Sequence, residues 1–124
     1  MTDQNLTSHP DTNQTIERII LANPISNVSP EQMADVIESG QVLITAIPGV
    51  EQMSFGMALD ADMPYRWYVR IRFRDEQALQ AYQIHPNHTD FGVQQWLPII
   101  ADRVVIDYRT QYWHPCEDIK HQGA

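Results

Sequence analysis

The chain has 124 residues, a length that suits one domain with a hydrophobic core of its own. Sixteen Asp and Glu residues against eight Lys and Arg residues give a net charge of -8, which disfavours binding to nucleic acid or to an anionic membrane surface. The single cysteine, Cys116, excludes an intrachain disulfide and a cysteine metal cluster, so a reducing compartment fits.

Both ends of the chain are expected to lie outside the folded domain. Residues 1–14 are polar, with too little apolar content to pack and neither the basic nor the apolar segment of a secretory signal. No apolar run approaches the length of a membrane span. We therefore expect a cytoplasmic protein with a flexible arm over 1–14, a folded domain over 15–112 and a tail over 113–124.

The first strand and the first helix are marked by local signals. An aliphatic and β-branched run over 15–22 predicts an inner strand that is covered on both faces. A helix should begin after Ser29, because Pro30 suits the first helical position and Gln32 completes a capping box. Apolar residues then recur at helical spacing as far as Ile44, which predicts one buried face.

The second and third strands follow a turn at 48–49. The second should run from residue 50 to about 59, and the third shows the clearest alternation in the chain. Its apolar face consists of Trp67, Val69, Ile71 and Phe73, and its other face of Tyr68, Arg70, Arg72 and Arg74. These arginines could grip an anionic substrate or pair with carboxylates across the sheet or between subunits. We favour pairing, since buried charges are seldom left alone.

A further helix should begin at Asp75 and end near His85, because Pro86 disfavours helical geometry before it and suits the start of a new helix. The new helix is expected to carry Phe91, Val93, Trp96, Leu97 and Ile100, with Pro98 kinking or ending it. The last strand should cover 104–110. This order is the ferredoxin-like β-α-β-β-α-β arrangement, an α+β fold with a four-stranded antiparallel sheet. Since its helices cover only one sheet face, a homodimer that stacks the other faces is expected.

Three segments of the chain resemble the stress-responsive dimeric α/β-barrel family. They are Ile47-Pro48-Gly49-Val50, the run from Phe73 to His88, and Leu97-Pro98 with Val105-Ile106-Asp107-Tyr108. The resemblance covers about 15–110, and Tyr-x-x-His-Pro-x-His over 82–88 is a fairly specific signature of it. It implies a homodimer in which two sheets close a barrel with the helices outside.

The resemblance also implies a candidate chemistry. Some members of the family are polyketide cyclases, in which the tyrosine and the second histidine of this motif promote an intramolecular aldol condensation without a cofactor. The corresponding residues here are Tyr82 and His88. An imidazole can deprotonate a methylene between two carbonyl groups near neutral pH, and a phenol can donate a hydrogen bond to the resulting enolate.

The substrate pocket is expected between the helices and the sheet, with an aromatic lining that suits a hydrophobic or aromatic small molecule. The expected substrate-binding residues are His85, Phe91, Trp96, Trp67, Phe55 and Arg18, with Ile106 as a further candidate. His85 could instead bond to the backbone at the helix break, which we favour. Asp90 could orient an imidazole or lie at the surface as a helix-start carboxylate.

Two positions depart from the family pattern. Arg18 and Trp67 stand where members of the family have histidines, so a reaction that needs those imidazoles would be lost. Arg18 could instead hold an anionic or carbonyl-rich ligand. The substrate should differ accordingly.

Two other functions compete with the cyclase. One is a non-catalytic dimeric protein that binds a small molecule or acts in a stress response, and the other is a cofactor-free monooxygenase. The resemblance implies that no cofactor is needed. We also expect no metal, because His85 and His88 lack a third ligand at a recognisable spacing.

Overall fold

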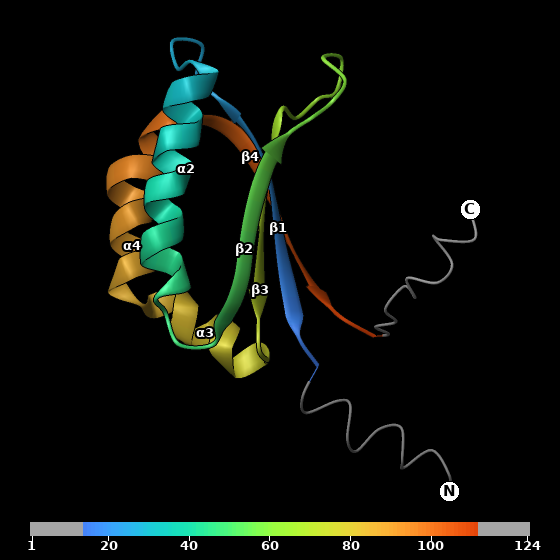
Figure 1. The fold of residues 1–124 in the computed structure, drawn as a ribbon, viewed down its shortest axis with the longest axis vertical. Coiled ribbons are helices and arrows are strands. Elements are labelled where there is room, and N and C mark those ends of the chain that lie inside the picture. The colour runs from blue at the N-terminus through green and yellow to red at the C-terminus, as the bar shows by residue number, and fades with distance from the viewer. Residues whose placement is uncertain (1–13, 112–124) are drawn as a thin grey trace, which may run out of the picture.

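The computed structural model describes residues 14–111, which form a four-stranded antiparallel sheet with helices on one face (Figure 1). The elements are β1 (Ile16–Pro24), α2 (Pro30–Thr45), β2 (Val50–Met57), β3 (Trp67–Phe73), α3 (Glu76–Ile84), α4 (Pro86–Phe91), a π-helical turn (Gly92–Trp96), a 3-10 turn (Leu97–Ile99) and β4 (Ile100–Arg109). The predicted ferredoxin-like fold is confirmed. The expected tail over 113–124 lies outside the described residues, as does the expected arm apart from residue 14.

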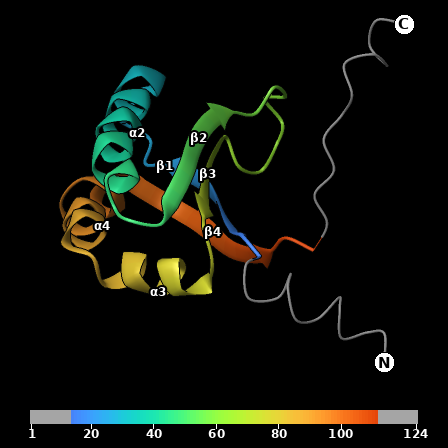
Figure 2. The same ribbon diagram turned by 60° about the horizontal axis from the view of Figure 1, so that its bottom comes forward.

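The strand order in the sheet is β2-β3-β1-β4, so β1 is an inner strand as predicted, but within residues 14–111 helices cover only one of its two faces. It pairs antiparallel with both neighbours, and Ile16 lies opposite Phe73 on one side and Arg109 on the other. Figures 1 and 2 show α2, α3 and α4 on the same side of the sheet. The other side carries no helix within residues 14–111.

The start of α2 matches the local prediction. The Ser29 hydroxyl accepts a hydrogen bond from the Gln32 backbone N–H at 3.1 Å, and the Gln32 side-chain oxygen accepts one from the Ser29 N–H at 2.8 Å. These bonds satisfy two N–H groups that a helix start otherwise leaves unpaired. The buried face of α2 consists of Met33, Ile37, Gly40 and Ile44.

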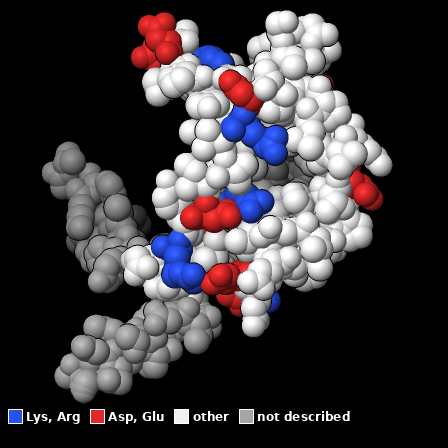
Figure 3. Space-filling view, turned by 180° about the vertical axis from the view of Figure 1, so that it is seen from behind, with Lys and Arg blue, Asp and Glu red and all other residues white. Residues whose placement is uncertain are grey.

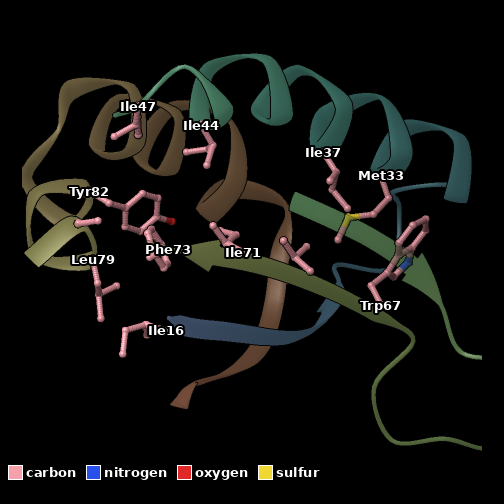
Figure 4. Close-up of a cluster of buried hydrophobic side chains, with 12 residues drawn as sticks. Ile16, Met33, Ile37, Ile44, Ile47, Trp67, Ile71, Phe73, Leu79 and Tyr82 are labelled. Atoms are coloured by element: carbon pink, nitrogen blue, oxygen red, sulfur yellow. The ribbon is translucent and has the colours of Figure 1, made fainter. Parts of the chain in front are cut away.

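The two faces of β3 also match the prediction. Its apolar residues are buried against the helices, where they form the centre of the core drawn in Figure 4. On the other face, Arg70 Nε lies 2.7 Å from a Glu17 carboxylate oxygen, and Arg72 Nε lies 3.5 Å from Glu51. The favoured interpretation of the arginines, as partners of carboxylates across the sheet, is confirmed for these two.

The segment after α4 differs from the prediction of one helix that reaches Ile100. The α-helix ends at Phe91. The wider π-helical turn and the tighter 3-10 turn then lead directly into β4, which begins at Ile100, four residues before the predicted start of the last strand. Pro98 has no N–H to continue a helix. In addition, the Ile25 N–H donates to the Ile99 carbonyl at 2.8 Å, which joins this segment to the end of β1 and extends the strand pairing.

Candidate functional site

A cavity of about 360 Å³ lies between the helices and the sheet. Its walls are mostly apolar and come from all four strands, all three α-helices and the two turns before β4. The lining residues are Arg18, Ile20, Ile37, Ile44, Met53, Val69, Ile71, Tyr82, His88, Thr89, Phe91, Gly92, Val93, Trp96, Leu97, Arg103 and Val105. The cavity therefore suits a mainly hydrophobic small molecule that meets a few polar groups.

Tyr82 is placed in the cavity by the last turn of α3. That helix starts at Asp75, whose carboxylate accepts a hydrogen bond from the Ala78 N–H at 2.9 Å. The side of α3 that faces the sheet buries Tyr82 to 2% exposure, and the phenol ring packs edge-on against Phe73 with centroids 4.8 Å apart. This packing fixes the ring in the core, at the wall of the cavity.

His88 is placed by the break between α3 and α4. His85 has an extended backbone there, and its Nδ1 accepts a hydrogen bond from the Asn87 N–H at 3.0 Å. The Asn87 amide in turn donates to the Leu43 carbonyl at 2.9 Å, which ties α4 to α2. The change of direction brings the His88 ring against the Tyr82 ring, with centroids 4.1 Å apart and planes inclined by 29°.

The surroundings of the two rings favour opposite protonation roles. Burial raises the pKa of Tyr82 to about 12, partly opposed by the charge of Arg18, so the phenol keeps its proton. Burial also lowers the pKa of His88, and Arg18 lowers it further, although the backbone carbonyls of Gln83 and Tyr82 oppose the shift. At neutral pH the site thus holds a phenol that can donate a hydrogen bond and an imidazole that can accept a proton.

One nitrogen of the His88 ring lacks a partner. Nδ1 is buried and makes no hydrogen bond to any residue within 14–111. A buried polar atom that stays unpaired costs free energy. This atom belongs to a side chain that lines the cavity.

Arg18 brings a third polar group to the same wall. Its Nε and one terminal nitrogen donate to the two Asp107 carboxylate oxygens at 2.8 and 3.0 Å. The guanidinium carbon lies 5.5 Å from the centre of the Tyr82 ring, a distance at which a cation is attracted to the aromatic face. The arginine side chain is 13% exposed, so the pair is largely shielded from solvent on the arginine side.

The structure brings together five of the residues that the sequence predicted for the site. These are Arg18, Tyr82, His88, Phe91 and Trp96, and all of them line the cavity. His85 is not a lining residue, because its side chain is used to cap α4, as in the favoured interpretation. Asp90 is exposed and hydrogen-bonds to neither imidazole within the described range, which agrees with its surface interpretation.

The remaining three candidates do not line the cavity. Phe55 and Trp67 stack on each other, with centroids 6.2 Å apart, near the start of β3. Figure 4 shows Trp67 and Tyr82 at opposite ends of the buried cluster, because Trp67 begins the strand and Tyr82 packs against its end. Ile106 alternates with Val105, a lining residue, and therefore points to the sheet face away from the helices.

Sequence reasoning missed two polar residues of β4. Asp107 holds Arg18, and Arg103 lines the cavity. Residues 103, 105 and 107 share one strand face, and that alternation was readable in the sequence. The pairing of Asp107 with Arg18 was not readable, because it depends on the register between β1 and β4.

The part of the chain that the structure describes offers neither a metal-binding cluster nor a helix able to span a membrane. No group of three or more His, Cys, Asp or Glu side chains comes together there in a way that could hold a metal ion. None of its helices combines the length and the apolar composition needed to span a membrane.

Comparison with known proteins identifies relatives of the whole folded region. Residues 16–110 match the family model of the stress responsive A/B barrel domain. A curated relative is the stress-response A/B barrel domain-containing protein HS1 of Arabidopsis thaliana, 25% identical over an alignment of 97 residues that covers 76% of this chain and 88% of the relative.

Two solved structures illustrate what the relatives look like. A dimeric ferredoxin-like protein from Thermobifida fusca is 30% identical, with a TM-score of 0.69 over 79% of this chain and 92% of its own. The hydroxynitrile lyase of Passiflora edulis is 17% identical, with a TM-score of 0.71 over 83% of this chain and 99% of its own. At that identity the lyase shares the fold, and the fold alone.

Proposed function

Because the chain belongs to the stress responsive A/B barrel domain family, we propose that it is a cofactor-independent enzyme that transfers protons in aldol-type reactions of small carbonyl compounds. The observation that carries the proposal is the contact between the Tyr82 and His88 rings, whose centroids lie 4.1 Å apart at the wall of a largely apolar cavity. The preferred reaction is the intramolecular cyclisation of a polyketide-like β-dicarbonyl compound.

In this mechanism neutral His88 removes a proton from the methylene between two carbonyl groups. The electron pair of the C–H bond becomes an enolate, and Tyr82 donates a hydrogen bond to the enolate oxygen. The enolate carbon then attacks a second carbonyl of the same molecule and forms the new C–C bond. The protonated imidazole returns its proton to the alkoxide, so the step needs neither an oxidant nor a reductant.

Arg18 supports this mechanism as a second hydrogen-bond donor. Asp107 occupies its Nε and one terminal nitrogen, and the guanidinium is also close enough to the Tyr82 phenol to lower the pKa of that phenol. Donors that are fixed before the reaction stabilise a developing negative charge most effectively in a site from which water is excluded. Because Asp107 already balances its charge, Arg18 is suited to a charge that forms during the reaction.

The hydroxynitrile lyase among the structural relatives indicates that this fold can belong to an enzyme, although the likeness extends to the fold alone. A hydroxynitrile lyase, by its name, breaks the C–C bond between a hydroxyl-bearing carbon and a nitrile. That step and an aldol condensation both break or form a C–C bond to a hydroxyl-bearing carbon. In both, a proton leaves or reaches the oxygen as a carbonyl group is formed or consumed. The fold they share is therefore compatible with the proton transfer proposed for Tyr82 and His88.

We also propose that the protein acts as a homodimer. Strand alternation puts Ile19, Leu21, Val104 and Ile106 on the sheet face that carries no helix, and each is half-buried in the single chain. A second copy would cover this apolar face. Solved relatives from Thermobifida fusca and Bacteroides fragilis are described as dimeric.

The proposed function is tested by incubating the protein with a linear poly-β-keto thioester and identifying the products by mass spectrometry. Removing a general base lowers a reaction rate by about 10²–10⁴-fold, so His88→Gln should lower the rate of cyclisation by a factor in this range. Tyr82→Phe should also slow cyclisation, whereas Arg109→Gln, which alters an ion pair with Glu76 away from the cavity, should not.

Equal rates in the wild type and both site variants would overturn the proposal. Substrate binding without turnover would favour the non-catalytic binding protein. Oxygen consumption with a quinol or an anthrone would favour the monooxygenase.

A further inference from the structure

The cavity holds two arginines in different electrostatic situations. Arg18 is paired with Asp107, so its positive charge is already balanced. Arg103 is exposed and makes no ion pair or hydrogen bond with a residue in 14–111. The cavity lining contains no Asp or Glu, although the chain has a net charge of -8. One uncompensated positive charge therefore belongs to the lining.

Arg103 lies at the opening of the cavity. Three apolar lining residues are also exposed, Val93 to 67%, Leu97 to 43% and Val105 to 42%, so this part of the lining meets solvent. Figure 3 views the molecule from behind and shows a hollow with basic side chains at its edge. A ligand that enters here would meet the Arg103 guanidinium before it reached the buried phenol.

The strand register separates Arg103 from the reactive end of the cavity. Arg103 lies opposite Ala22, whereas Asp107 lies opposite Arg18. Four residues of β-strand span about 13 Å, so the two basic groups are held at different positions along the cavity wall. A ligand that contacts both Arg103 and the reactive end of the cavity needs an anionic end and a reactive end, with an apolar part between them.

We propose that the substrate carries a permanent anionic group, a carboxylate or a phosphate, and that Arg103 binds this group at the opening of the cavity. A guanidinium binds either group through two parallel hydrogen bonds. The apolar walls then hold the middle of the substrate, and the reacting carbonyl lies at Tyr82 and His88. The last assignment rests on the proposed function, but the binding of the anion does not.

The test uses probes that need no turnover. N-phenylnaphthylamine, a neutral fluorescent probe, is bound to the protein and displaced by octanoate, octyl phosphate or octanol, which share one apolar chain. In the wild type we expect octanoate or octyl phosphate to bind about tenfold more tightly than octanol, which corresponds to about 1.4 kcal/mol. The stronger of the two anions identifies the acidic group as a carboxylate or a phosphate.

Two matched variants test whether Arg103 causes the tighter binding of the anions. Arg103→Gln should remove the advantage of the anions and leave octanol binding unchanged. Arg109→Gln removes one positive charge from the same strand outside the cavity, so it should keep the advantage. Equal preference for the anions in the wild type and in Arg103→Gln would overturn the proposal, as would loss of the preference in Arg109→Gln. If the preference behaves as expected while cyclisation fails, the anion site stands and the proposed reaction falls.

Discussion

Arg18 and Asp107 face each other on β1 and β4 and are joined by two hydrogen bonds of 2.8 and 3.0 Å. The register of two strands thereby sets the position of the guanidinium over the Tyr82 ring. The two charges act on the phenol in opposite directions. Arg18 lowers the pKa of Tyr82 and Asp107 raises it, on top of the larger rise caused by burial.

This arrangement predicts opposite effects from the two halves of one ion pair. Asp107→Asn should lower the pKa of Tyr82 from about 12, and Arg18→Gln should raise it. The phenolate absorbance of each variant, minus that of the same variant carrying Tyr82→Phe, isolates this titration from the other tyrosines. Shifts in the same direction would contradict the proposed geometry, because a purely structural disturbance has no reason to distinguish the two charges.

The lowered pKa of His88 predicts a stability effect at acid pH. The unfolded chain takes up a proton on this residue near its ordinary pKa of about 6.5, whereas the folded protein resists it until a lower pH. The free energy of unfolding should therefore fall as the pH drops below about 6.5, and level off below the folded-state pKa. Chemical denaturation of the wild type and of His88→Gln at several pH values gives the difference between their free energies of unfolding, which should change over this pH range. A difference that stays constant with pH would contradict the burial of the imidazole.

Gly40 should be intolerant of a side chain. A Cβ at this position would lie 2.5 Å from the Phe91 ring, and both residues are buried. Gly40→Ala should reduce the free energy of unfolding by about 1–3 kcal/mol, because overpacking strains the core, and it should displace a wall of the cavity.

Gly92→Ala is the matched control for this packing effect. No atom lies within 4 Å of a Cβ at Gly92, and alanine favours helical geometry over glycine by up to about 1 kcal/mol. Thermal and denaturant unfolding should show a loss of stability in Gly40→Ala but not in Gly92→Ala. Equal stability of both variants would mean that α2 and Phe91 pack less closely than described.

The open face of the sheet predicts the oligomeric state. Light scattering of the wild type should give twice the chain mass of 14.3 kDa. Ile106→Lys places a charge on the apolar face and should yield monomers, whereas Val42→Lys, at a position 73% exposed on α2, should remain dimeric. A monomeric wild type would refute the proposed dimer, and a dimeric Ile106→Lys would move its interface elsewhere.

The parts of the fold that could be predicted depend on local chemistry. Ser29 and Gln32 cap α2 through neighbouring backbone groups, and the break at His85 follows from Pro86. Such features need no knowledge of the rest of the chain. The same break brought Tyr82 and His88 together, so the central pair of the site could also be anticipated.

The parts that could not be predicted depend on long-range register. Arg18 and Asp107 are 89 residues apart in the sequence, and only the pairing of β1 with β4 joins them. Trp67 has the residue type of a pocket wall, but it occupies the end of β3 remote from Tyr82. A pattern of alternation assigns a residue to a face, whereas its position along the strand decides whether it reaches the cavity.

The most direct test of the central claim is the exchange of the α-deuterium of a β-keto thioester, followed by NMR, because it isolates the first proton transfer from cyclisation. The wild type should accelerate exchange, with a rate that rises with pH through an inflection below about 6.5 and then stays level, since the pKa of Tyr82 is about 12. His88→Gln should abolish the acceleration, and Tyr82→Phe should reduce it without moving the inflection to higher pH. Equal exchange in the wild type and His88→Gln would contradict the assignment of His88 as the base.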